Sequence, residues 1–427
     1  MKSFLKSLVA NMLAILAMAV IQKYRPLIVM VTGSVGKTST KDALASVLAV
    51  RYNLRASEKS YNSEFGVPLT ILGSKNPWEK PAAWLRVFQE AFALLLFPNL
   101  YPKLLVLEVG ADRPGDLARI LRICKPDAVV VTRLPDVPVH VEAYASPQAV
   151  REEEFAPAYA LTHGAQLVIS ADDPNAVTMA SLLPLSIATF GFADGADVRL
   201  EGYSFFEEGE VSGMEAMLNV RGEARTLRVP GALGRSQLYA PAAAIALALS
   251  LDMTLEEALK GAEAYVPPAG RGRIIRGCKG SLIIDDSYNA SPAAVEEALS
   301  ALHLLTTRTR RIAVLGDMLE LGRYSKEEHE RVGTLVAEKA DVLVAVGTRS
   351  RATAEAARSA GMIEGNVFAF DTALEAADML EEFVAEGDVV LVKGSQGIRT
   401  ERIAERLLRD SEDRSKLVRQ EREWKQR

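Results

Sequence analysis

The sequence contains few of the residues that build disulfides and metal clusters. Its two cysteines, Cys124 and Cys278, lie far apart and form no CxxC pair, which excludes a disulfide framework and a zinc ribbon. The four histidines are scattered and form no histidine-rich cluster, although one of them can still serve as a ligand. No nucleophile elbow is recognisable, so an activated serine is not indicated. We therefore expect two unpaired thiols in a reducing compartment.

Positive charge is not in excess either. The chain has 50 Lys and Arg against 55 Asp and Glu, with a net charge of -5. No overall basic field is available to hold nucleic acid, so we expect no nucleic-acid partner, and any phosphate must bind at a local site. With 427 residues, of which 49% are hydrophobic, the chain can bury a sizeable core and form about two to three domains.

The first 25 residues form an apolar segment that allows several interpretations. Lys2 and Lys6 precede an apolar run, Leu8–Ile21, which resembles a signal peptide but is short for a bilayer span. A core strand follows at once, which argues against cleavage and export. Helical spacing favours a packed or interfacial amphipathic helix over a true anchor, with residues 3–21 as the stretch that would touch a membrane surface. The residues with this spacing are Leu5, Leu8, Val9, Met12, Leu16 and Val20.

Short apolar runs separated by helical segments begin at residue 26 and predict an α/β fold. The expected buried strands are Pro26–Thr32, Leu104–Val109, Ala128–Thr132, Gln166–Ser170, Leu282–Asp285, Arg311–Leu315, Val342–Val346 and Val389–Val392. Residues 195–231 alternate apolar and polar side chains and predict an antiparallel β excursion, and Ala240–Leu251 predicts a buried helix.

These patterns predict a domain organisation. We expect an N-terminal apolar helix (1–25), a P-loop ATPase domain with a mostly parallel sheet (26–267), a C-terminal Rossmann-like α/β domain (268–410) and a charged tail (411–427). The linker is placed at Pro267–Gly270, which cannot continue a helix. The tail is expected to be a frayed or solvated helix.

The strongest local signal is the segment 32–40, which reads TGSVGKTST between a strand and a helix expected at Lys41–Val50. Backbone N-H groups of such a loop cradle phosphates, and the helix N-terminus adds partial positive charge. Lys37 would reach the β and γ phosphates, and the Thr38 hydroxyl would bind Mg2+. The loop is a shortened variant, because Val31 stands where the full pattern has its first glycine. The expected ATP contacts here are Gly33, Ser34, Val35, Gly36, Lys37, Thr38 and Ser39.

Several separated segments resemble the Mur ligase family, and most closely its members that add D-alanyl-D-alanine. The loop with its surroundings, VTGSVGKTSTK, also lacks the first Walker glycine in that family. The other matching segments are 62–72 (NSEFGVPLTIL), 107–111 (LEVGA), 140–142 (HVE), 285–292 (DDSYNASP), 314–322 (VLGDMLELG) and 392–395 (VKGS).

The resemblance implies an ATP-dependent ligase that phosphorylates a carboxylate and lets an amine attack the acyl phosphate. It implies ATP and Mg2+ as cofactors, and a UDP-muramoyl peptide and D-alanyl-D-alanine as substrates in cell-wall synthesis. Glu108, at the end of a strand, and His140 would hold Mg2+. We expect a cytoplasmic monomer, working in solution or at the inner face of the membrane.

Further roles also follow from the resemblance. Arg271 would touch ATP as the C-terminal domain closes, Asp286 would contact the nucleotide and Lys393 the phosphates. Asp317 and Glu320 would shape the amine pocket or cap local structure. The catalytic residues implied are Lys37, Glu108, His140 and Lys393, and the substrate contacts are Asn62, Glu64, Tyr288, Asn289 and Ser395.

The chain also departs from the family pattern. Where members have a carbamylated lysine that supports Mg2+, this chain has Glu154, whose carboxylate would supply the charge directly. Gln237 replaces one residue of a His-Asn pair and would offer its amide to adenine, and Gln396 replaces an arginine. Family members have a separate N-terminal UDP-binding domain, whereas only residues 1–25 precede the first strand here. Two alternatives therefore remain, namely a related ligase with another amino-acid or lipid-linked acceptor, and a non-catalytic ATP-binding partner of cell-wall enzymes.

Overall fold

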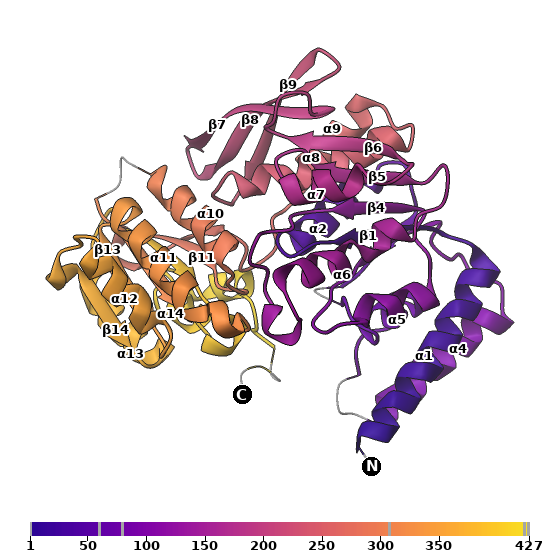
Figure 1. Cartoon of the computed structure of the whole chain (residues 1–427), viewed down its shortest axis with the longest axis horizontal. Coiled ribbons are helices and arrows are strands. Elements are labelled where there is room, and N and C mark those ends of the chain that lie inside the picture. Colours follow the sequence, from indigo (N-terminus) through magenta and orange to yellow (C-terminus); the bar gives the residue numbers. More distant parts are fainter. Residues whose placement is uncertain (1, 59–60, 78–80, 306–308, 422–423, 425–427) are drawn as a thin grey trace.

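The computed structural model describes residues 2–58, 61–77, 81–305, 309–421 and 424. Two sheets with helices on both faces lie side by side, and a pair of long helices, α1 and α4, extends from the N-terminal half (Figure 1). The predicted α/β fold class, with mostly parallel sheets, is confirmed.

The first sheet has nine strands in the order β2-β3-β1-β4-β5-β6-β7-β8-β9. Strands β1 to β6 pair in parallel, and β7, β8 and β9 form an antiparallel meander where the sequence predicts the β excursion. The strands are β1 (Leu27–Thr32), β2 (Leu54–Ala56), β3 (Leu104–Glu108), β4 (Ala128–Val131), β5 (Gln166–Ser170), β6 (Ser186–Gly191), β7 (Val198–Glu208), β8 (Val211–Val220) and β9 (Glu223–Pro230).

Alternate residues of these strands feed two cores, because successive side chains of a strand point to opposite faces. Val29 and Val31 belong to the core on one face, to which α2 (Lys37–Leu48), α8 (Ser236–Ser250) and α9 (Leu255–Glu263) also contribute. Ile28 and Met30 belong to the core on the other face. The helices of that face are α1 (Lys2–Tyr24), α3 (Gly66–Leu72), α4 (Pro81–Leu96), α5 (Asp116–Ile123), α6 (Pro147–Tyr159) and α7 (Pro174–Ala180).

The second sheet has the order β10-β11-β15-β12-β13-β14, in which only β10 runs antiparallel to its neighbour. Its strands are β10 (Arg273–Arg276), β11 (Leu282–Asp286), β12 (Arg311–Gly316), β13 (Val342–Val346), β14 (Val367–Phe370) and β15 (Val389–Lys393). The flanking helices are α10 (Pro292–His303), α11 (Ser325–Lys339), α12 (Ser350–Ser359), α13 (Ala373–Phe383) and α14 (Glu401–Arg406). Short 3-10 turns complete this half: η2 (Cys278–Gly280), η3 (Gly322–Tyr324), η4 (Glu364–Asn366), η5 (Gln396–Ile398) and η6 (Ser411–Lys416).

The buried face of α1 agrees only in part with the one that the spacing predicts. Leu16 and Val20 are buried, together with Leu13 and Ala17, whereas Leu8 and Met12 are exposed. The helix is apolar on nearly all sides, so spacing alone does not determine which side packs. The side chain of Leu5 lies outside the residues whose side chains the structure describes.

The prediction of a solvated tail is confirmed for the mostly exposed residues 411–416 but is wrong for residues 417–419. After η6 the chain docks back onto the body, and Leu417, Val418 and Arg419 are buried. Arg419 Nη1 donates to Glu401 Oε2 at 2.9 Å and to the carbonyl of Ser287 at 3.2 Å. In the sequence, Leu417 and Val418 are surrounded by charged residues, so no apolar pattern predicts their burial. The ion pair between Arg419 and Glu401 joins residues that only the fold brings together. Residues 422–423 and 425–427 lie outside the described residues.

Candidate active site

The phosphate loop joins β1 to α2, at the carboxyl end of a central parallel strand. Gly33 and Gly36 have φ of 119° and 91°, a backbone region that side chains other than glycine rarely adopt. The turn is tight enough that α2 begins at Lys37, four residues before the predicted start. The N-H groups at the start of α2 lie at the sheet edge where ligands of open α/β sheets bind.

Glu108 ends the neighbouring strand β3 and is almost completely buried beside the loop. The Thr38 hydroxyl donates to Glu108 Oε1 at 3.2 Å, and Glu108 Oε2 has no hydrogen-bond partner among the residues that the structure describes. Burial raises the pKa of Glu108, against the positive charges of Lys37, Lys41 and Arg271. A buried carboxylate oxygen without a partner fits a cation, and Mg2+ in such sites takes one or two carboxylates besides phosphate and water.

Glu154 reaches the same loop from α6. Its Oε2 accepts a hydrogen bond from Ser34 Oγ at 2.5 Å, and its backbone carbonyl accepts one from Thr32 Oγ1 at 2.5 Å. The side chain is buried, and burial raises the pKa of Glu154 while Lys37, Ser34 and His140 lower it. Glu154 is thus the only one of the three successive glutamates 152–154 that touches the phosphate loop in the described structure.

His140 contacts both halves of the molecule. Its Nδ1 lies 2.7 Å from Glu320 Oε2, and its Nε2 lies 3.5 Å from Asp112 Oδ1. Burial lowers the pKa of His140, but Glu320 and Asp112 outweigh it, so the pKa is raised overall. Both His140 and Glu320 have left-handed backbones, at φ of 66° and 64°, a strain that is often found at functional contacts.

The predicted metal residues do not form a preassembled cage. Within the described part of the chain, no three His, Cys, Asp or Glu side chains are grouped to hold a metal ion. Thr38 and Glu108 are adjacent, Glu154 lies across the loop, and His140 is engaged by Glu320. A metal here would depend on phosphate oxygens for part of its coordination.

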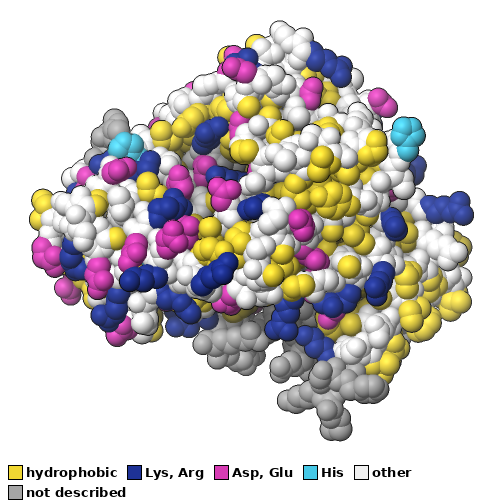
Figure 2. Space-filling model, viewed as in Figure 1, with side chains coloured by type: hydrophobic (Ala, Val, Ile, Leu, Met, Phe, Trp, Pro, Cys, Tyr) yellow, Lys and Arg dark blue, Asp and Glu magenta, His cyan; other side chains and the backbone are white. Residues whose placement is uncertain are grey.

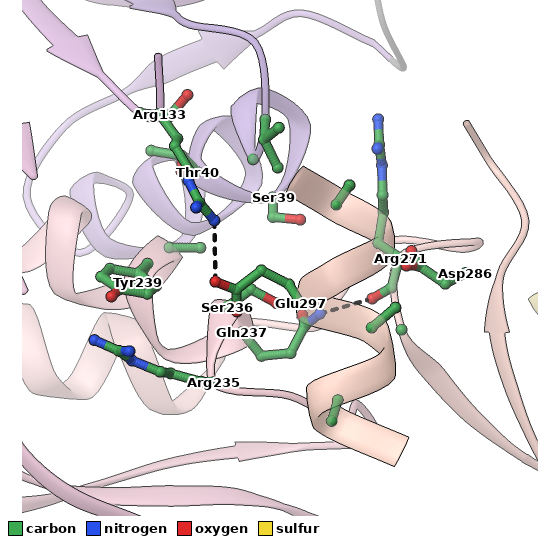
Figure 3. A pocket seen from close by; sticks show the side chains of 18 of the residues that line it. Ser39, Thr40, Arg133, Arg235, Ser236, Gln237, Tyr239, Arg271, Asp286 and Glu297 are labelled. Atoms are coloured by element: carbon green, nitrogen blue, oxygen red, sulfur yellow. Dashed lines mark hydrogen bonds and ion pairs between the residues drawn. The ribbon is translucent and has the colours of Figure 1, made fainter. Parts of the chain in front are cut away.

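A cavity of about 420 Å³ opens from the phosphate loop towards the second sheet (Figure 3). The ATPase side contributes Gly36, Ser39 and Gln237, and the C-terminal side contributes Asp286 and Lys393. The cavity therefore lies between the two halves, as a site for a nucleotide and a second reactant requires.

Arg271 links the two walls. Its Nη2 lies 3.4 Å from Thr38 Oγ1, its guanidinium lies 4.1 Å from the ring centroid of Tyr288, and its carbonyl accepts a hydrogen bond from Gln237 Nε2 at 3.1 Å. On the same side, Lys393 Nζ is 2.6 Å from Asp286 Oδ2 and donates to the carbonyl of Asn289 at 3.0 Å. The three predicted C-terminal contacts Arg271, Asp286 and Lys393 thus all line the cavity.

The remaining predicted residues differ in their positions. Asn62 lies close to Gly110 and Lys37. A Cβ atom added at Gly110 would lie 3.0 Å from Asn62 Nδ2 and 3.6 Å from Lys37 Cε, so both side chains approach this glycine. Glu64 instead pairs with Arg119 at 3.2 Å, and Ser395 accepts from the N-H of Leu319 at 2.9 Å.

Two further side chains serve local structure. Asn289 accepts from the N-H of Ala290 at 2.9 Å. Asp317 accepts from the N-H and hydroxyl of Ser350, both at 2.8 Å, so it caps α12. Of the two roles that the sequence leaves open for Asp317, the structure shows capping.

Sequence reasoning missed a polar group on the far side of the cavity. Arg133 bridges to Glu297 of α10 at 3.0 Å across the two halves (Figure 3). Asp172 accepts from the Tyr239 hydroxyl at 2.6 Å and lies 3.4 Å from Arg235. Arg133 and Asp172 follow the carboxyl ends of β4 and β5, and the rule that ligands gather at those ends was the signal for both.

Comparison with known proteins places this architecture in a family. Residues 90–248 match the Mur ligase middle domain, and residues 270–396 match the Mur ligase glutamate ligase domain. A UDP-N-acetylmuramoyl-tripeptide--D-alanyl-D-alanine ligase of Mycobacterium bovis is 30% identical over 405 residues, covering 90% of this chain and 73% of the relative. This chain belongs to the Mur ligase family. The resemblance found in the sequence is thereby confirmed.

Other Mur ligases are similar over comparable lengths. The ligase of the same name from Bacillus subtilis is 26% identical over 394 residues, covering 92% of this chain and 78% of that protein. A crystal structure of MurF ligase from Thermotoga maritima in complex with ADP is 26% identical, with a TM-score of 0.77, and the match covers 95% of this chain and 84% of that one. Glu108, His140 and Glu154 lie in the segment matching the Mur ligase middle domain, and Arg271 and Lys393 lie in the other.

Proposed function

We propose that this chain is an ATP-dependent amide-bond ligase that adds D-alanyl-D-alanine to a UDP-muramoyl tripeptide, the reaction for which its relatives are named. The observation that carries the proposal is a shared cavity, with a phosphate loop on one wall and Arg271, Asp286 and Lys393 on the other. Such a site holds the triphosphate of ATP against a second reactant.

In this mechanism the phosphate loop binds and orients the triphosphate through its N-H groups and Lys37. The γ-phosphoryl group passes to the substrate carboxylate, and the amine of the second substrate then attacks the acyl phosphate and releases phosphate. Two anions must approach each other in the first step, so fixed positive charge is the main factor that stabilises the transition state. Lys37 supplies that charge from the phosphate loop, and Arg271 supplies it from the segment just after the linker. Lys393 supplies it from the C-terminal side.

Mg2+ would be held by the Thr38 hydroxyl and the free oxygen of Glu108, and when bound it neutralises phosphate charge. Glu154, in place of the family lysine, orients the loop through Ser34 and places a carboxylate near Lys37. We assign His140 a supporting role, because Glu320 holds its ring at the boundary between the two halves.

The substrate contacts are proposed from position. Gln237 lines the cavity and would offer its amide oxygen, which is buried without a partner, to the adenine amino group. Asn62 lies beside Lys37 and would meet the carboxylate substrate, with Glu64 at the edge of that region. Tyr288, Asn289 and Ser395 surround the amine side, where closure of the two halves would exclude water from the acyl phosphate.

The domains proposed for this activity are the central unit 26–267 and the C-terminal unit 268–410. The chain would act as a monomer in the cytoplasm, where ATP is available, without nucleic acid. We also propose that the N-terminal helix, over residues 3–21, lies against the membrane surface. Its segment Lys6–Tyr24 is long and apolar enough to cross a bilayer by length and composition alone.

The deciding experiment is ADP release by the purified full chain with ATP, Mg2+, UDP-muramoyl tripeptide and D-alanyl-D-alanine. We expect release that requires both substrates, with the amide product identified by mass spectrometry. Release with other amino acids but not with D-alanyl-D-alanine would replace the proposed acceptor. ATP binding without ADP release under every acceptor condition would refute the ligase and leave a nucleotide-binding partner.

A further inference from the structure

Helices α1 and α4 form a pair at one edge of the molecule, and they extend beyond the sheet that they partly cover (Figure 1). On α1, the buried side is formed by Leu13, Ala17 and Val20, and on α4 it is formed by Val87 and Ala91. These side chains fix the pair to the N-terminal domain. They leave the opposite side of each helix without a partner in the described structure.

The free sides of both helices carry many large apolar residues, with Ser7 and Asn11 on α1 and Arg86 and Gln89 on α4 as exposed polar residues beside them. On α1, large apolar side chains recur at helical spacing, and Ile15 is 61% exposed. On α4, Leu85 and Leu96 are 61% and 73% exposed, and Leu100 just beyond the helix is 96% exposed. The exposed apolar residues of this surface are Leu8, Met12, Ile15, Met18, Leu85, Phe92, Leu96, Phe97 and Leu100.

Figure 2 shows hydrophobic side chains along the lower right of the molecule, where α1 and α4 lie in Figure 1. Soluble monomers rarely keep so many large apolar groups together in water, and such patches usually mark an interaction site. We call this set of residues the apolar platform.

The charges around the apolar platform indicate what covers it. Residues 1–25 contain four Lys and Arg and no Asp or Glu. At the end of α1, Arg25, Arg122 and Lys125 line an open hollow of about 840 Å³. None of these three side chains makes a hydrogen bond or an ion pair with the residues that the structure describes. The single carboxylate there, Asp127, accepts the N-H of Ile28 at 2.8 Å. Gln22, on the exposed side of α1, also lines the hollow, so the apolar stripe leads into the cationic group.

The contacts of α1 show that the helix is packed against the domain, which a helix crossing a membrane would not be. Lys23 Nζ donates to the carbonyl of Leu94 at 2.8 Å, and the Tyr24 hydroxyl donates to the same carbonyl at 2.7 Å. The Tyr24 ring stacks on Tyr101 with centroids 4.5 Å apart. A spanning α1 would break these contacts and expose the core under Leu13 and Val20, whereas a docked α1 keeps them all.

We propose that the apolar platform docks this chain on an anionic lipid bilayer, with Arg25, Arg122 and Lys125 meeting the headgroups. The apolar side chains enter the interface, and the unpaired cations are attracted to the negative surface. The proposal deepens the membrane contact of α1 given above by adding α4 and the cationic group. It is independent of the ligase reaction.

The test is sedimentation of the full chain with vesicles. One set contains phosphatidylglycerol and phosphatidylcholine in equal parts, and the other contains phosphatidylcholine alone. We expect binding to the anionic vesicles that weakens at high salt, and at least about tenfold weaker binding to the neutral ones. The double variant Ile15→Glu/Leu96→Glu should lose at least about tenfold in binding, because two apolar anchors are removed. Arg122→Gln/Lys125→Gln should lose the preference for anionic lipid.

Matched controls lie elsewhere on the surface. Leu182→Glu changes a side chain that is 77% exposed outside the apolar platform, and Lys326→Gln removes an exposed cation from α11. Both should bind vesicles as the unmodified chain does. ADP release in lipid-free buffer should be the same for all variants, so a chain without ligase activity would refute the proposed reaction but not the docking.

Several results would overturn the proposal. One is that the unmodified chain binds neither kind of vesicle. Another is that Leu182→Glu loses as much vesicle binding as Ile15→Glu/Leu96→Glu. Resistance of the bound chain to extraction by alkaline carbonate would indicate a spanning helix instead. A dimer that Ile15→Glu/Leu96→Glu dissociates, seen by light scattering in the absence of vesicle binding, would show that a second copy covers the platform.

Discussion

The most informative single change is Glu154→Gln. The amide has almost the same shape as the carboxylate and can still accept the hydrogen bond from Ser34, now 2.5 Å long. What disappears is one negative charge beside Lys37, in a position that is fully buried. The variant therefore separates the charge of this residue from its packing.

The expected magnitude follows from that placement. Removing a group that orients metal ligands typically weakens metal affinity by about 10- to 100-fold. The Mg2+ concentration that gives half-maximal ADP release should rise by about that factor. Stability should not fall, because burial raises the pKa of Glu154 and a neutral amide avoids the cost of burying the charge.

The neighbouring Glu153→Gln is the matched control. Glu153 lies on the same helix, but its carboxylate accepts from the N-H groups of Gly115 and Leu117 at 3.1 and 2.9 Å, at the start of α5. It should lower the free energy of unfolding by about 1 kcal/mol, as loss of a helix cap does, and leave the Mg2+ requirement unchanged. The assay is an Mg2+ titration of ADP release beside urea unfolding for both variants.

An unchanged Mg2+ titration in an active, folded Glu154→Gln variant would refute the reasoning. A second arm tests the comparison with the family lysine. Glu154→Lys should be inactive in carbon dioxide-free buffer and regain activity with bicarbonate, if the position needs a carboxylate. Full activity of the lysine variant without bicarbonate would count against a negative charge at this position.

Three further predictions concern other parts of the chain. Lys37→Ala should abolish ATP binding measured by calorimetry, because it removes the lysine of the phosphate loop, and retained affinity would contradict the site. Burial raises the pKa of Asp285 from 3.8 to about 6, so between these pH values the folded chain keeps a proton that the unfolded chain releases. The free energy of unfolding therefore falls as the pH rises through this range. Asp285→Asn should remove that fall, about 3 kcal/mol, in urea unfolding at pH 4 and pH 6.5, and an unchanged slope would refute the assignment. Arg419→Ala should lower the free energy of unfolding by about 2–3 kcal/mol, because it removes one of the two arginine hydrogen bonds to the buried Glu401. Arg414→Ala, at an exposed ion pair, should cost little, and equal effects of the two variants in chemical denaturation would contradict the docked tail.

The sequence was sufficient for the parts of the fold that local patterns determine. Buried strands such as Gln166–Ser170 and Val342–Val346 have the bounds expected from their apolar runs, because both faces of a central parallel strand are covered. Strands at or near an edge were missed, including β2 and β14, because they are short and only partly buried. The strand β10 was missed because its four residues begin and end with arginine.

The site was predictable where a residue follows a strand or lies in the phosphate loop. Glu108, Asp286 and Lys393 were found in this way, and the structure brings each of them to the loop or the cavity. Partners contributed by distant elements were not predictable. Glu297 meets Arg133 only because α10 of the C-terminal half faces the cavity that Arg133 also lines, and no local pattern marks such a pair.

The position of Arg271 has a consequence for the order of events. Its guanidinium lies on the ring of Tyr288, in the second half of the molecule, while one nitrogen reaches the same Thr38 hydroxyl that a metal-bound triphosphate requires. The oxygen that Mg2+ would take is thus already in contact with Arg271. We expect that nucleotide and Mg2+ in the loop move the arginine nitrogen off this oxygen, and with it the Tyr288 ring on which the guanidinium rests, so that filling the first half is coupled to the position of the second half.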